Sequence, residues 1–128
     1  MALSNPYNAY NQYKQNNIIT APPEELTLML YNGTIKFANQ AMLAIDEKNV
    51  PKAHELILRT EAIIAELNAT LDMQYELSKN LRALYEFISD RLLQANISKD
   101  KKYIEEALVI ITEMRDTWKE AMVLAKKK

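Results

Sequence analysis

The side chains of this chain that could do chemistry are one histidine and a set of carboxylates, because cysteine does not occur. Glu55 follows His54, but the zinc-hydrolase motif that begins this way needs a second histidine one turn further along. A di-iron bundle needs two Glu-x-x-His motifs with further glutamates. A single histidine can supply neither set. The sequence therefore predicts no catalytic residue and no metal site.

A glycine loop, paired carboxylates and a phosphoryl-accepting histidine are three further features that can carry chemistry. The only glycine, Gly33, cannot form a phosphate-binding loop, so no cofactor is expected. Paired carboxylates such as Glu24 and Glu25 are explained by helix capping and solvation. A helical histidine can accept a phosphoryl group, so phosphotransfer at His54 stays open as a minor hypothesis, although a lone histidine in the first turns of a helix is usually a solvated surface residue.

Charge and composition exclude several partners. The 128 residues carry 16 basic and 17 acidic side chains, interspersed along the chain, whereas nucleic-acid binding favours a basic excess on one face. No apolar run reaches the roughly 18 residues that a membrane span needs. Met1–Tyr13 lack the pattern of a secretory signal, and the absence of cysteine fits a reducing compartment. We expect a cytoplasmic protein that binds no nucleic acid and inserts into no membrane.

Turn-forming residues are too few for a β-domain, with one glycine and four prolines, so the fold class expected is all-α. Pro22-Pro23-Glu24-Glu25 is typical of a helix start, and Asn49-Val50-Pro51 is typical of a second. Short connections favour an antiparallel up-and-down four-helix bundle. The predicted bundle spans residues 21–128, with helices at about 22–47, 50–71, 75–96 and 100–126, and residues 1–20 form an extended or short-helical cap segment.

Apolar residues at helical spacing predict the inward faces of these helices. For the first helix the stripe is Leu26, Met29, Leu30, Gly33, Phe37, Ala41 and Ala44; for the second it is Ala53, Leu56, Ile57, Ile63, Ile64, Leu67 and Leu71. For the third helix it is Leu77, Leu81, Leu84, Ile88, Leu92 and Ala95, and for the fourth Ile104, Leu108, Ile111, Met114, Trp118 and Met122.

The first helix also carries a second apolar stripe, nearly opposite the first, made of Leu28, Tyr31, Ile35, Ala38 and Met42. A helix in a bundle normally needs one such stripe with polar residues behind it. An apolar surface left open on a protein is a binding site or a liability. Smaller surpluses occur on the second and fourth helices, at Leu58, Ala62, Val109, Ile110, Val123 and Leu124.

Two explanations of the second stripe stay open. Residues 1–20, which contain Tyr7, Tyr10, Tyr13, Ile18 and Ile19, either cover it permanently or leave it to a partner polypeptide that displaces them. A different class of protein, a structural bundle that dimerises through this stripe and has no client, is the alternative.

Several motifs carry a family likeness. Asn5-Pro6-Tyr7-Asn8-Ala9-Tyr10 and the block from Ile19 to Gly33 resemble the opening of the flagellar secretion chaperone family, FliS. The likeness continues through Leu81-Arg82-Ala83-Leu84-Tyr85, Leu92-Leu93-Gln94-Ala95-Asn96 and the helix of Trp118, so it covers essentially the whole chain. Pro22 departs from the family pattern, which commonly has a small capping residue there.

The resemblance implies a partner and a mechanism. Family members bind the carboxy-terminal, assembly-forming segment of flagellin in the cytoplasm, keep it from polymerising, and help present it, once bound, to the flagellar export gate. Their amino-terminal tyrosine segment lies over the binding groove and moves when the client binds, which maps onto Tyr7 and Tyr10. Together with the second stripe, this gives the predicted partner-binding residues: Tyr7, Tyr10, Ile19, Leu28, Tyr31, Ile35 and Met42.

Overall fold

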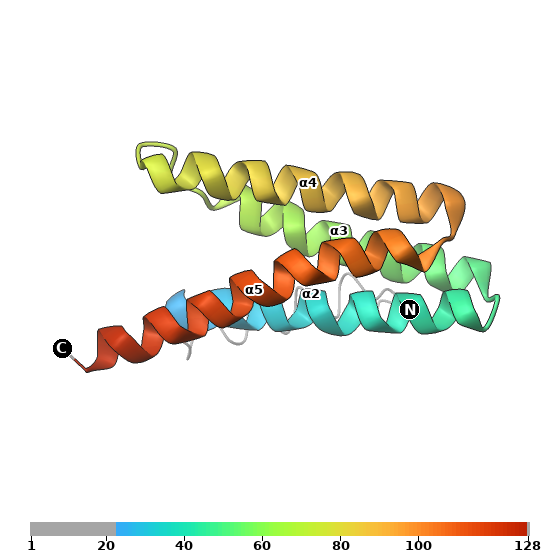
Figure 1. Ribbon diagram of the computed structural model, residues 1–128, viewed down its shortest axis with the longest axis horizontal. Helices are drawn as coiled ribbons and strands as arrows, with labels where there is room; N and C mark the ends of the chain where they lie inside the picture. The colour runs from blue at the N-terminus through green and yellow to red at the C-terminus, as the bar shows by residue number, and fades with distance from the viewer. Residues whose placement is uncertain (1–22, 128) are drawn as a thin grey trace, which may run out of the picture.

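The computed structural model describes residues 23–127, and this range is built from four helices without a strand. They are α2 (Pro23–Asp46), α3 (Val50–Ala69), α4 (Glu76–Ser98) and α5 (Lys101–Lys126). Consecutive helices run in opposite directions (Figure 1). The predicted all-α four-helix bundle is therefore confirmed. The cap segment predicted for residues 1–20 lies outside the described residues.

Local capping explains why the chain reverses where it does. The side chain of Asn49 accepts a hydrogen bond from the backbone N–H of Lys52 at 3.2 Å, and Pro51 occupies the first turn of α3. Both features favour a helix start at Val50. At the reversal between α4 and α5, Lys99 has the left-handed conformation that ends many helices, and the side chain of Asp100 accepts a hydrogen bond from the backbone N–H of Lys102.

Each helix packs against two neighbours, because α2 and α4 each contact both α3 and α5. The side chains between them form one continuous apolar core. The core is filled mainly by branched aliphatic residues, which lose little freedom on packing and fill space well. Its largest fully buried members are Ile57, Ile63, Ile64, Ile88, Leu92, Ile104 and Ile111.

The prediction that the second stripe of the first helix is an open surface is wrong for two of its members. Tyr31 is 4% exposed and Ala38 is 1% exposed, so both belong to the core. Ile35 and Met42 are half-buried and pack against that core. The physical reason is that α2 lies between α3 and α5 and needs apolar side chains toward both, so two stripes on one helix are both used inside the bundle.

Two polar contacts between helices lie at the end of the bundle that holds the starts of α3 and α5. The ammonium group of Lys101 lies 2.9 Å from the carboxylate of Asp46, which joins α5 to α2. His54 donates from Nδ1 to the side-chain carbonyl of Asn96 at 3.1 Å, joining α3 to α4. These exposed contacts contribute little stability individually, but they fix which helix ends meet.

Candidate partner-binding surface

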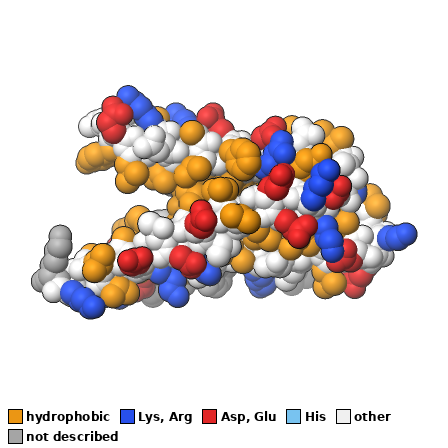
Figure 2. Space-filling model, in the orientation of Figure 1, with side chains coloured by type: hydrophobic (Ala, Val, Ile, Leu, Met, Phe, Trp, Pro, Cys, Tyr) orange, Lys and Arg blue, Asp and Glu red, His pale blue; other side chains and the backbone are white. Residues whose placement is uncertain are grey.

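An open apolar wedge lies between the first half of α4 and the second half of α5. The two helices are joined near α5's start by the Arg91–Glu106 ion pair, at 3.2 Å, and they separate toward α5's end (Figure 1). Figure 2 shows hydrophobic side chains lining the hollow that this separation leaves. We call this surface the α4–α5 wedge and define it by Leu77, Leu81 and Leu84 on α4 and Met114 and Trp118 on α5.

The two walls are matched by the antiparallel register of the helices. Starting from Arg91 and Glu106, about two turns along each helix reach Leu84 and the level of Met114. About two turns more reach Leu77 and the level of the turn that follows Trp118. Leu81, Met114 and Trp118 pack against the core on their inner sides. The wedge is therefore continuous with the interior of the bundle at its closed end.

Leu77 belongs to the predicted inward face of the third helix, but it is not buried as a core residue would be. Leu77 has the same helical phase as Leu81, Leu84 and Ile88, but its side chain is 65% exposed. The phase is inward, yet nothing within residues 23–127 covers it, because α5 has diverged from α4 at this level (Figure 1). An inward-facing leucine without a cover is the clearest mark of the wedge.

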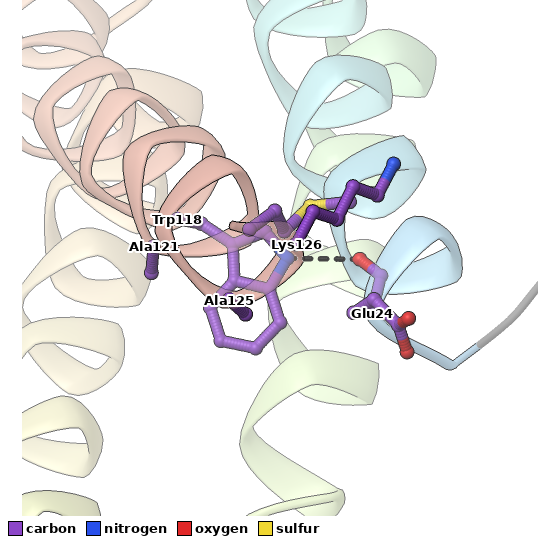
Figure 3. Close-up of a pocket in the computed structure, with 6 residues that line it drawn as sticks. Glu24, Trp118, Ala121, Ala125 and Lys126 are labelled. Atoms are coloured by element: carbon purple, nitrogen blue, oxygen red, sulfur yellow. Dashed lines mark hydrogen bonds between the residues drawn. The ribbon is translucent and has the colours of Figure 1, made fainter. Parts of the chain in front are cut away.

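Trp118 attaches the second half of α5, which forms one wall of the wedge, to α2. Its indole Nε1 donates to the backbone carbonyl of Glu24 at 2.8 Å, as Figure 3 shows. Beside this bond lies a shallow depression of about 440 Å³, lined by Glu24, Trp118, Ala121, Met122, Ala125 and Lys126. None of residues 112–126 is buried, so this contact is a main attachment of α5's second half to the rest of the bundle.

Replacing Trp118 by phenylalanine is expected to loosen the second half of α5. The ring is kept but the N–H is lost, and a net hydrogen bond contributes about 0.5–1.5 kcal/mol. Amide hydrogen exchange in residues 112–126 should speed up by about 2- to 10-fold, while exchange around Ile104 stays unchanged. Equal exchange in both proteins would contradict the role given to the indole N–H.

Two tyrosines close the inner end of the wedge. Tyr31 of α2 and Tyr85 of α4 are almost fully buried, and their hydroxyl oxygens lie 2.7 Å apart in a hydrogen bond. Burial raises the pKa of both phenols, and for Tyr85 the bond to Tyr31 raises it further. Both groups are therefore neutral at physiological pH. The predicted inward face of the third helix does not include Tyr85, although Tyr85 precedes Ile88 by three residues and Leu92 by seven, a spacing that indicates the same face.

The charged and titratable side chains of the described residues lie apart from the wedge or are used in contacts between helices. Within residues 23–127, no three histidine or acidic side chains are placed to hold a metal ion. His54 is exposed at the opposite end of the bundle from the wedge, with Nδ1 occupied by Asn96. Burial raises the pKa of Glu61, and the nearby His54 opposes that shift. What the described surface offers is apolar contact area.

The partner-binding residues predicted from the sequence lie partly on α2 and partly outside the described residues. Leu28, Ile35 and Met42 are half-buried on α2, while Tyr31 lies at the closed end of the wedge. The positions Tyr7, Tyr10 and Ile19 fall outside the described residues. The predicted surpluses on the other helices are exposed at Leu58, Val109, Val123 and Leu124, and half-buried at Ala62 and Ile110.

The fold and the wedge define a class: a helical bundle with an open apolar surface and, among the described residues, no metal-binding cluster. None of the helices α2 to α5 is both long and apolar enough to cross a bilayer. The family model "Flagellar protein FliS" matches residues 6–125. The chain belongs to the FliS family of flagellar secretion chaperones, and it is a chaperone rather than an enzyme. The family resemblance inferred from the sequence motifs is thereby confirmed.

Named relatives support this assignment. The flagellar secretion chaperone FliS of Bacillus subtilis is 43% identical over 122 residues, which covers 95% of this chain and 90% of the relative. The protein of the same name from Escherichia coli is 31% identical over 109 residues, covering 83% and 80%. A crystal structure of a bacterial flagellar chaperone shares the fold, with a TM-score of 0.74, 24% identity, and coverage of 89% of this chain and 94% of that one.

Proposed function

We propose that this chain is a cytoplasmic export chaperone whose α4–α5 wedge binds the carboxy-terminal segment of flagellin. The client segment, apolar on one face, is kept from polymerising, and the loaded complex is delivered to the flagellar export apparatus. The observation that carries the proposal is the uncovered apolar wedge, and above all Leu77, which faces inward and has 65% of its surface exposed.

Binding is favoured by the burial of apolar side chains of the wedge and opposed by the entropy lost when the client segment becomes ordered. Full burial of a leucine side chain contributes about 1.5–3 kcal/mol. Ordering a disordered client segment costs about 2–5 kcal/mol or more. Leu77 alone does not offset that cost, so the client must also cover other apolar surface. The remaining wedge residues offer such surface on the two facing walls: Leu81 and Leu84 on α4, and Met114 and Trp118 on α5.

The predicted role of residues 1–20 remains part of the proposal. Tyr7, Tyr10 and Ile19 would cover apolar surface in the free protein and give way to the client, while Leu28, Ile35 and Met42 would contribute from α2. Tyr31 enters in a different way from that predicted, because its side chain is buried and acts from within the bundle.

Sedimentation of the purified full chain tests the function. We mix the chain with a peptide of the carboxy-terminal segment of flagellin from the same organism, and use a peptide of the same composition in scrambled order as the control. A monomer that forms a one-to-one complex with the native peptide only is the expected result. A homodimer whose mass is the same with and without peptide would favour the alternative, a structural bundle without a client.

A further inference from the structure

The Tyr31–Tyr85 hydrogen bond crosses the bundle between helices that are not neighbours. The extensive contacts of α2 are with α3 and α5, so α2 and α4 face each other across the diagonal. Within residues 23–127, no other hydrogen bond joins α2 to α4; the remaining ones between helices link adjacent pairs, such as Arg115 with Asn32 or Arg82 with Asn68. This bond is therefore a diagonal tie.

The tie lies where the closed part of the bundle ends and the wedge begins. Tyr85 is the last large buried side chain of α4 in the direction of its start, and Leu30 and Tyr31 are the first buried residues of α2. On α5 the last buried residue is Ile111, which the antiparallel register places close to the level of Tyr85. Beyond this layer, the walls of the wedge are half-buried or exposed.

The tie also has a well-defined length. Tyrosine has two side-chain torsions and a rigid ring, so each arm holds its hydroxyl at a nearly constant reach from its helix. The 2.7 Å separation is that of a good O–H···O bond, which is directional. Two rigid arms joined by a directional bond restrain the distance between α2 and α4 in addition to the restraint from aliphatic packing.

We propose that Tyr31 and Tyr85 are positioning residues that fix the spacing of α2 and α4 at the closed end of the wedge. This spacing holds the wedge at the width that receives the client segment. This inference rests on the proposed function, because its readout is client binding. The pair preorganises the binding surface, which lowers the free-energy cost of reshaping that surface when the client binds.

Removal of both hydroxyls separates this role from simple core stability. A single tyrosine-to-phenylalanine change leaves the other buried hydroxyl without its partner, so each single variant should be less stable than the wild type. The double variant Tyr31→Phe, Tyr85→Phe replaces both polar groups by apolar ones of the same shape, which is nearly neutral for stability. It lacks the directional bond but keeps both rings.

Calorimetric titration of the full chain with the flagellin carboxy-terminal peptide tests the proposal. The double variant should melt near the wild-type temperature but bind the peptide about tenfold more weakly. Tyr103→Phe is the matched control, because Tyr103 is a half-buried tyrosine on α5 whose hydroxyl makes no hydrogen bond to the described residues, and it should bind within twofold of wild type. Wild-type affinity in the double variant would overturn the proposal.

A distance measurement gives a readout that does not depend on the client. The chain has no cysteine. The substitutions Lys36→Cys on α2 and Lys79→Cys on α4 therefore provide the only two attachment sites for spin labels. The α2–α4 distance distribution should be narrow in the wild type and broader in the double variant. An identical distribution would overturn the proposal.

Different results contradict the proposed function and the positioning role of the two tyrosines. If the wild-type chain does not bind the peptide at all, the proposed function is wrong, whatever the distances show. If the wild type binds and the double variant binds equally well with an unchanged distance distribution, the function stands and the positioning role is wrong.

Discussion

Replacing Leu77 by aspartate is expected to weaken binding of the flagellin segment by about 100-fold or more. The loss combines the burial energy of a leucine, about 1.5–3 kcal/mol, with the cost of covering an unpaired carboxylate. Each 1.4 kcal/mol corresponds to a factor of ten in affinity. Calorimetric titration of both proteins with the peptide measures the difference.

The folded state should tolerate this change. Leu77 is already 65% exposed, and a carboxylate in the first turn of α4 interacts favourably with the positive end of the helix. Leu93→Asp is the matched control, because Leu93 lies on the same helix with 50% of its surface exposed but away from the wedge. If both variants lose affinity equally, or if Leu77→Asp binds normally, the client does not occupy the wedge.

Replacing Ile88 by alanine is expected to destabilise the bundle by about 2–5 kcal/mol, the range for removing a large aliphatic side chain from a core. Ile88 is fully buried in the middle of α4, where the side chains of α4 meet the rest of the core. A bundle of this size has a total stability of about 5–15 kcal/mol, so the change removes a large share of it. Urea denaturation followed by circular dichroism measures the loss.

The neighbouring residue provides the comparison. Phe87 is 45% exposed, and its ring lies 5.6 Å from the guanidinium of Arg91. Phe87→Ala should cost less, about 1–2 kcal/mol, because it removes an exposed cation–π contact and only part of a buried ring. A loss below about 1 kcal/mol for Ile88→Ala, or equal losses for both variants, would show that the apolar contact between helices is looser than the structure indicates.

Much of the fold was predictable because helices in a bundle repeat local rules. The spacing of Ile57, Ile64, Ile88 and Leu92 identifies inward faces, and all four residues are fully buried. Asn49 and Pro51 identify the start of α3, and the structure shows the expected side-chain cap. Such features depend on residues close together in the chain, so they can be recognised without coordinates.

An apolar binding surface could be predicted from the sequence, but its location could not. The sequence indicated surplus apolar residues but assigned the surplus to the wrong surface, because a helical wheel counts faces and does not show how many neighbours a helix has. The face of α2 that contains Tyr31 and Ala38 is used inside the bundle, since α2 packs against both α3 and α5. The uncovered surface instead begins at Leu77, which helical phase assigns to the core.

By itself, the sequence determined the all-α class, the family, the absence of a cysteine or multi-histidine centre, the inward faces of α3, α4 and α5, and one of the two inward faces of α2. Only the tertiary structure decided which inward-facing residues are covered, and it joined Tyr31 to Tyr85 across 54 positions of chain. The physical reason is that burial depends on the angle at which α5 leaves α4. That angle results from packing between segments far apart in the chain, so no local spacing encodes it.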